Sequence, residues 1–142
     1  MYWDASALVP LVVAEESSSL VRTWVEQDSL IVTWAWTRVE IISALERRSR
    51  QGELTREERR ACLRRLDLLA GTWDEVTDLF SVRTRAIPLL ARHALRAADA
   101  AQLAAALLIA EDNPSSLRFA CLDDKLANIA ELEGLQLPGR QS

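Results

Sequence analysis

The chain has few of the nitrogen and sulfur side chains that most often bind metals. Its 142 residues include one His and two Cys. The single histidine, His93, excludes His-rich metal sites. Cys62 and Cys121 lie far apart without CxxC spacing, which argues against a disulfide framework or a structural zinc site. We interpret both cysteines as small core residues in a reducing compartment.

Long apolar runs are also absent. No segment is long enough to span a membrane. Asp4 and Pro10 fall too early for a secretory signal peptide, and no basic region precedes an apolar one. We therefore expect a cytoplasmic protein that makes no membrane contact.

The residues that are present indicate a folded domain. Apolar residues make up 49% of the chain and charged residues 27%, with only four Gly and four Pro, which argues against disorder. No repeat or linker divides the chain, so residues 1–142 should form one domain. The net charge of -4 argues weakly against a general basic coat for nucleic acid.

Short strands alternate with helices along the chain. We expect strands at 1–3, 30–33, 73–77, 117–122 and, at a sheet edge, 135–137. Helices are expected at 5–9, where Pro10 stops the first one, and at 20–25, 37–51, 56–70, 79–90, 97–110 and 124–132. Gly52 should end one helix, Thr55 and Glu58 should form a capping box, and Asp78 should cap the following helix. The alternation predicts the α/β class: a three-layer α/β/α fold around a central, mostly parallel sheet of about four to five strands.

Four acidic residues interrupt or end apolar segments: Asp4, Glu40, Asp99 and Asp123. Removing a lone carboxylate from water costs several kcal/mol unless it is paired, hydrogen-bonded or bound to a metal. Two of these acids follow strands and two lie in the first turns of helices, so all four can meet at the carboxyl edge of a parallel sheet. Carboxylates without His or Cys suit hard cations such as Mg²⁺ or Mn²⁺, and such a site can hydrolyse phosphodiesters.

Each acid also has an ordinary structural interpretation. Asp4 and Asp123 can cap the helices that follow them. Asp99 lies favourably near a helix N-terminus, and Glu40 can pair with Arg47 or Arg38. One such explanation is easy to accept, but four acids with apolar neighbours in one chain favour a shared metal site.

The acids occur in segments 2–8, 39–48 with 52–55, 95–104 and 121–126. In this order the segments resemble the motifs of the PIN-domain family, and within it the VapC-type toxins of bacterial toxin–antitoxin modules. The resemblance covers nearly the whole chain, and segment 95–104 is its most specific part.

The resemblance implies an Mg²⁺- or Mn²⁺-dependent endoribonuclease that is homodimeric and is inhibited by a cognate antitoxin protein. It makes Asp4, Glu40, Asp99 and Asp123 the catalytic, metal-binding acids. It makes Ser6 an auxiliary hydroxyl near the metal.

Two positions depart from the family's pattern, and a third is ambiguous. The family often has Thr or Ser where this chain has Cys121, whose thiol is a poorer hydrogen-bond partner. It often has His where this chain has Gln102. Asp124 competes with Asp123 for the role of fourth acid, although the spacing to Leu126 favours Asp123.

Residues 46–65 form an expected helical hairpin rich in arginine: Arg47, Arg48, Arg50, Arg56, Arg59, Arg60, Arg64 and Arg65. The hairpin can bind phosphate groups, receive an acidic antitoxin segment, or be a solvated face with i,i+4 pairs to Glu57 and Glu58. His93 should be a helix-end or loop residue. Most of the five tryptophans should be core, with Trp34 or Trp36 lining the cleft, a dimer surface or an antitoxin groove.

The leading interpretation is thus a toxin endoribonuclease. A PIN-type nuclease of RNA processing without a toxin role is the second interpretation. A degenerate, non-catalytic PIN-like binding module is the third, and it is disfavoured because no acid is missing.

Overall fold

The strands assemble into one parallel sheet. The computed structural model describes residues 1–139, so the last three positions of the expected domain, 140–142, lie outside it. The strands are β1 (Tyr2–Trp3), β2 (Val32–Trp34), β3 (Asp74–Val76) and β4 (Phe119–Ala120), in the order β3-β2-β1-β4. Every pairing between these strands is parallel.

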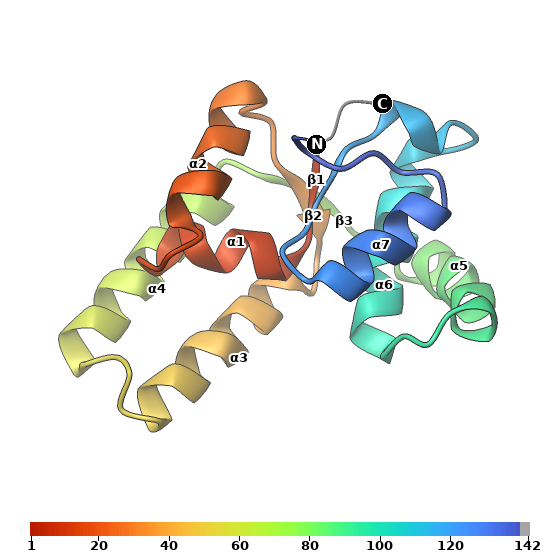
Figure 1. The fold of residues 1–142 in the computed structure, drawn as a ribbon. Coiled ribbons are helices and arrows are strands. Elements are labelled where there is room, and N and C mark those ends of the chain that lie inside the picture. The colour runs from red at the N-terminus through yellow and green to blue at the C-terminus, as the bar shows by residue number, and fades with distance from the viewer. Residues whose placement is uncertain (140–142) are drawn as a thin grey trace.

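Helices cover both faces of this sheet (Figure 1). One side carries α1 (Ala5–Val12), α2 (Ser18–Gln27), α3 (Thr37–Arg50) and α4 (Arg56–Ala70), and the other carries α5 (Leu79–Arg92), α6 (Ala97–Ala110) and α7 (Asp124–Leu132). A short 3-10 helix, η1, spans Pro114–Ser116. The predicted three-layer α/β/α fold is confirmed. None of the helices within residues 1–139 has the length and apolar character needed to cross a bilayer.

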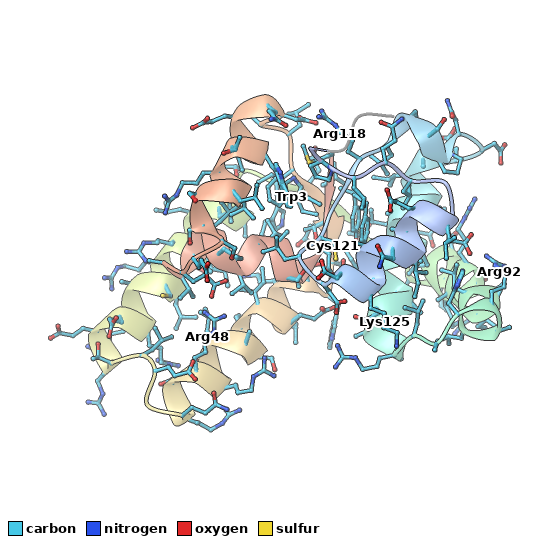
Figure 2. The ribbon with its side chains drawn as sticks, in the orientation of Figure 1. Trp3, Arg48, Arg92, Arg118, Cys121 and Lys125 are labelled. Carbon is cyan, nitrogen blue, oxygen red and sulfur yellow. The ribbon has the colours of Figure 1, made fainter. Side chains whose placement is uncertain are left out.

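The strands contribute side chains to two hydrophobic cores. Tyr2 packs into the core on the α5–α7 side, where its ring stacks on that of Phe119 with 5.5 Å between centroids. Trp3 belongs to the core on the α1–α4 side. Figure 2 shows Trp3 in the middle of the molecule and Arg48 and Arg92 toward its two sides. Tyr2 and Trp3, adjacent in β1, thus pack into opposite cores, as expected for a strand that is buried on both faces.

Several helix ends follow from the residues beside them. Thr55 and Glu58 form the predicted reciprocal capping box at the start of α4. Asp78 caps α5 by accepting a hydrogen bond from the Ser81 backbone N–H at 3.1 Å. Gly52 follows α3 with a φ of 77°, a left-handed conformation that favours glycine. These predictions are confirmed, as are the bounds predicted for α6.

The prediction that Pro10 stops the first helix is wrong. α1 continues through Pro10 to Val12. Leu8, Val9 and Val12 are all buried, so tertiary packing of this apolar helix outweighs the local cost of proline.

All five predicted strands are shorter than expected, and three of them differ most. β2 begins at Val32 rather than at Leu30, because Leu30 is 71% exposed outside the sheet. β4 keeps only Phe119 and Ala120 of its predicted span. The expected strand at 135–137 is reduced to a parallel bridge between Arg118 and Gln136.

Candidate active site

The four predicted acids line one pocket at the carboxyl edge of the sheet. This acid pocket has a volume of about 330 Å³, and its polar lining consists of Asp4, Ser6, Glu15, Glu40, Arg47, Arg48, Arg96, Asp99 and Asp123. Asp4 caps α1 after β1, and Asp123 caps α7 after β4. Glu40 and Asp99 lie in the first turns of α3 and α6. The parallel topology therefore brings together carboxylates from four separate elements.

Asp4 is the most buried of these acids, with 5% of its surface exposed. Its Oδ2 accepts hydrogen bonds from the Ser6 backbone N–H at 3.2 Å and from Ser6 Oγ at 2.6 Å. Burial raises the pKa of Asp4, the bonds from Ser6 and Cys121 lower it, and the charge of Asp99 raises it. Within residues 1–139, Oδ1 accepts no hydrogen bond and is not sealed from solvent, so it remains accessible to a ligand.

Ser6 links the ends of two strands. Its hydroxyl donates to Asp4 and accepts a hydrogen bond from the Leu122 backbone N–H at 2.9 Å. The Cys121 thiol lies 3.5 Å from Asp4 Oδ2 and 3.4 Å from the backbone carbonyl oxygen of Asp123. Burial raises the pKa of this thiol and keeps it neutral. Cys121, where the family often has Thr or Ser, therefore contacts the carboxylate of Asp4 but only the backbone of Asp123.

Glu40 is half-buried, and its Oε1 accepts a hydrogen bond from Gln102 Nε2 at 3.1 Å. Burial raises the pKa of Glu40 to about 7; the bond from Gln102 lowers it, the charges of Asp4 and Asp99 raise it, and Arg96 lowers it. Within residues 1–139, Glu40 forms neither of the ion pairs considered for it, with Arg47 or with Arg38, and Arg38 pairs with Asp67 instead. A carboxyl group that titrates near neutral pH beside other acids is typical of functional sites.

Asp99 and Asp123 are more accessible. Asp99 Oδ2 lies 3.3 Å from Arg96 Nε, and its side chain is 20% exposed. Asp123 Oδ1 accepts the Leu126 backbone N–H at 3.1 Å as a helix cap. Asp124 is exposed and, unlike Asp123, is not among the described residues that line the acid pocket. The geometry thus favours Asp123 as the fourth acid.

The donor set fits a hard divalent cation by its chemistry. Carboxylate and hydroxyl oxygens are the ligands that Mg²⁺ and Mn²⁺ prefer. A cation would also relieve the burial and repulsion that raise the pKa values of Asp4 and Glu40. Across residues 1–139, however, no three acidic, His or Cys side chains form a group that could hold one ion as they stand. The acids would therefore have to draw together around a cation.

The PIN-domain family matches residues 1–132, which is most of the chain. This protein belongs to the PIN-domain family. PIN domains are generally nucleases and usually use divalent metals, so a hydrolase acting on nucleic acid is supported. No curated protein matches the chain.

Arginines lie at the edge of the acid pocket in this PIN domain. Arg48 forms an ion pair with Glu15 at 2.8 Å, and Arg96 is paired with Asp99. Arg47 forms no ion pair within the described part of the chain. An unpaired guanidinium beside the acids suits a phosphate group, which would bring its own negative charge into the pocket.

The other arginines of the α3–α4 hairpin have mixed roles. Arg59 pairs with Glu46 across the hairpin at 2.7 Å, and Arg65 donates to a backbone carbonyl at the end of α1 at 3.1 Å. Glu58 is engaged in the capping box. In residues 1–139 no i,i+4 ion pair with Glu57 or Glu58 occurs, so that part of the prediction is wrong. Arg50, Arg56, Arg60 and Arg64 are nevertheless exposed, as expected for a solvated face.

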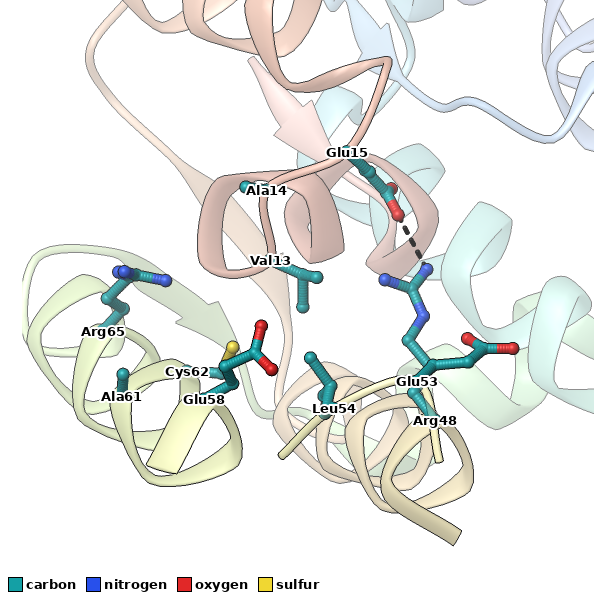
Figure 3. Close-up of a pocket in the computed structure, with 10 residues that line it drawn as sticks. All are labelled: Val13, Ala14, Glu15, Arg48, Glu53, Leu54, Glu58, Ala61, Cys62 and Arg65. Atoms are coloured by element: carbon teal, nitrogen blue, oxygen red, sulfur yellow. Dashed lines mark ion pairs between the residues drawn. The ribbon is translucent and has the colours of Figure 1, made fainter. Parts of the chain in front are cut away.

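A second cavity of about 490 Å³ lies between the end of α1 and the α3–α4 hairpin (Figure 3). The ion pair between Glu15 and Arg48 lines both cavities and lies between them. The charged lining of the second cavity is Glu15, Arg48, Glu53, Glu58 and Arg65. Because these residues include more acids than bases, the cavity favours neither phosphate nor an acidic antitoxin segment.

His93 and the tryptophans occupy mostly structural positions. His93 ends α5, with its Nε2 2.7 Å from Glu133 Oε1, as predicted for a helix-end residue. Four tryptophans are buried, whereas Trp36 is 61% exposed just before α3. What Trp36 contacts in an assembly stays a prediction.

Sequence reasoning missed one residue beneath the pocket. The sequence marks Gln102 only as a departure from the family's pattern, yet this residue is fully buried and hydrogen-bonds Glu40. The signal that could have found it is a polar side chain in a nearly all-apolar helix, where it needs hydrogen-bond partners.

Proposed function

We propose that this PIN domain is an endoribonuclease that hydrolyses RNA phosphodiester bonds with Mg²⁺ or Mn²⁺. The acids Asp4, Glu40, Asp99 and Asp123 would hold the metal, and Ser6 would be the auxiliary hydroxyl. The observation that carries the proposal is the convergence of these carboxylates from four elements in one pocket. Family membership supports the nuclease class.

The residues of the chain divide the work. Ser6 fixes Asp4 Oδ2 and leaves Oδ1 free for a ligand. Arg47 would bind a phosphate oxygen at the edge of the pocket. A bound divalent cation supplies Lewis-acid activation of water and of the phosphate. Glu40, whose pKa is about 7 without metal, would lose its proton when it binds the cation.

The test is cleavage of an end-labelled single-stranded RNA by the purified protein with Mg²⁺, Mn²⁺ or EDTA. Asp99→Asn and Asp123→Asn should each lower kcat by about 100-fold or more, because a metal ligand is lost. Asn still caps helices, so the second change spares α7. Asp124→Asn is the matched control and should leave cleavage unchanged. Cleavage that persists in EDTA or in Asp99→Asn would contradict the proposal.

In this proposal the protein is the toxin of a type II toxin–antitoxin module and is inhibited by a cognate antitoxin. The order of the four acidic motifs supports that role. The free thiols of Cys62 and Cys121 support a cytoplasmic location. Expression of wild type should arrest bacterial growth, and expression of Asp4→Asn should not. Cleavage without growth arrest would indicate an RNA-processing nuclease, and neither cleavage nor metal binding would indicate a binding module.

The proposed homodimer is supported by an exposed apolar stripe on α5. Phe80, Ile87 and Leu90 are 66%, 62% and 44% exposed at helical spacing. Phe80→Glu should convert a dimer to a monomer in sedimentation velocity, whereas Leu68→Glu, at a 75% exposed position on α4, should not. A monomeric wild type would contradict this part of the proposal.

A further inference from the structure

Beneath the acid pocket lies a chain of buried hydrogen bonds centred on Gln102. The amide oxygen Oε1 of Gln102 accepts a hydrogen bond from the Tyr2 hydroxyl at 2.6 Å. Its Nε2 donates to Thr37 Oγ1 at 2.9 Å and to Glu40 Oε1 at 3.1 Å. Tyr2, Thr37 and Gln102 are each 0% exposed, so the bonds among them form away from water, whereas the bond to Glu40 is partly buried.

The members of this chain lie close in sequence to three of the acids. The neighbouring pairs are Tyr2 with Asp4, Thr37 with Glu40, and Gln102 with Asp99. The chain thereby joins β1, α3 and α6 directly below the residues that would hold the metal.

The hydrogen bonds also fix the orientation of the amide. Thr33 Oγ1 lies 2.7 Å from the backbone carbonyl oxygen of Trp3 and 2.7 Å from Thr37 Oγ1. The carbonyl can only accept, so Thr33 donates to it and Thr37 supplies the proton between the two hydroxyls. Thr37 Oγ1 is then free to accept from Gln102. A reversed amide would instead turn its carbonyl oxygen toward the carboxylate of Glu40.

We infer that Gln102 is a positioning residue that restrains Glu40 Oε1 at the acid pocket, so that the other acids can draw together around a cation beside a carboxylate already held in place. Tyr2 and Thr37 are its supports. This inference rests on the proposed function. Glu40 has a long side chain that samples many rotamers when nothing restrains it. Removing the hydrogen-bond partner of a metal ligand typically weakens metal binding about 10- to 100-fold.

The test is titration of the full chain with Mn²⁺ by isothermal calorimetry. Gln102→Met keeps an unbranched side chain of similar length but removes the amide, and should weaken Mn²⁺ binding about 10-fold or more. Gln102→His restores one donor and one acceptor nitrogen and should stay within about threefold of wild type. Leu103→Val is the control, since it perturbs the same buried part of α6 without a hydrogen-bonding group and should not change Mn²⁺ affinity.

Cleavage assays give a second readout that a merely structural role would not produce. In Gln102→Met the Mn²⁺ concentration for half-maximal cleavage should rise by the same factor as the dissociation constant. The KM for RNA at saturating Mn²⁺ should stay within about twofold of wild type, because no RNA contact is removed. If Gln102→Met does not fold, Tyr2→Phe removes only one support and should weaken Mn²⁺ binding about threefold.

Each contrary result has a distinct meaning. Equal Mn²⁺ affinity of wild type and the folded variant, or an equal loss in Leu103→Val, would overturn the positioning role while leaving the proposed function intact. Failure of Gln102→His to recover binding would also overturn it. A wild-type protein that binds no Mn²⁺ would overturn the proposed function and this inference together.

Discussion

Replacement of Glu40 by glutamine should stabilise the metal-free protein at alkaline pH. Burial raises the pKa of Glu40 from 4.5 to about 7, so the folded protein binds this proton more tightly than the unfolded chain does. The free energy of unfolding therefore falls as pH rises from about 4.5 to about 7, and the penalty is complete above that range. Glutamine has no charge to desolvate and keeps the oxygen that accepts from Gln102.

The size of the effect follows from the pKa difference. Each pKa unit corresponds to about 1.4 kcal/mol, which sets an upper limit of about 3.4 kcal/mol for Glu40. Because the side chain is only partly buried, solvent screening reduces this to about 1–2 kcal/mol. The free energy of unfolding of Glu40→Gln should thus exceed that of wild type by this amount at pH 8 and match it at pH 4.

The measurement is urea unfolding in EDTA, followed by tryptophan fluorescence at pH 4, 6 and 8. Glu16→Gln, at an exposed position in the α1–α2 loop, is the control and should show no such pH dependence. Added Mn²⁺ should stabilise wild type more than Glu40→Gln. A variant that is less stable than wild type at pH 8, or a difference that is the same at every pH, would refute the reasoning.

Four further predictions follow from the described contacts. Arg47→Ala should weaken RNA binding and reduce the slope of log binding constant against log salt concentration by the amount expected for about one phosphate contact. Arg64→Ala, at an exposed position on α4, should leave that slope unchanged. Ser6→Ala should cost about 1–2 kcal/mol in urea unfolding, because the Leu122 N–H loses its partner. Thr55→Ala should cost about 1 kcal/mol through the lost cap, without changing cleavage. Mn²⁺ titration at pH 6.5 in buffers of different ionisation enthalpy should show proton release from the site.

The features predicted well from sequence are those with local causes. The capping box at Thr55, the cap at Asp78 and the turn at Gly52 each depend on residues within about one helical turn, so their patterns were sufficient. Pro10 failed as a stop signal because the packing that keeps α1 helical around it comes from distant parts of the chain.

The candidate site also has features that the sequence predicts and features that depend on residues far apart in the chain. The convergence of the acids could be expected from their places after strands and at helix starts. The role of Gln102 could not, because its partners Tyr2 and Thr37 lie 100 and 65 residues away. Asp123 and Asp124 were hard to separate because they are adjacent, and only the start of α7 shows which of them lines the pocket.

The two-sided packing of the sheet has a consequence for when such a nuclease could act. Asp4 and Glu40 come from the α1–α4 side, whereas Asp99 and Asp123 come from the α5–α7 side. A chain in which only one layer has docked brings only two of these four acids into place. Under the proposed function, a nascent chain would therefore be unable to cleave the messenger RNA from which it is translated until Asp123 has left the ribosome and α7 has packed. RNA cleavage would then begin only when folding is complete.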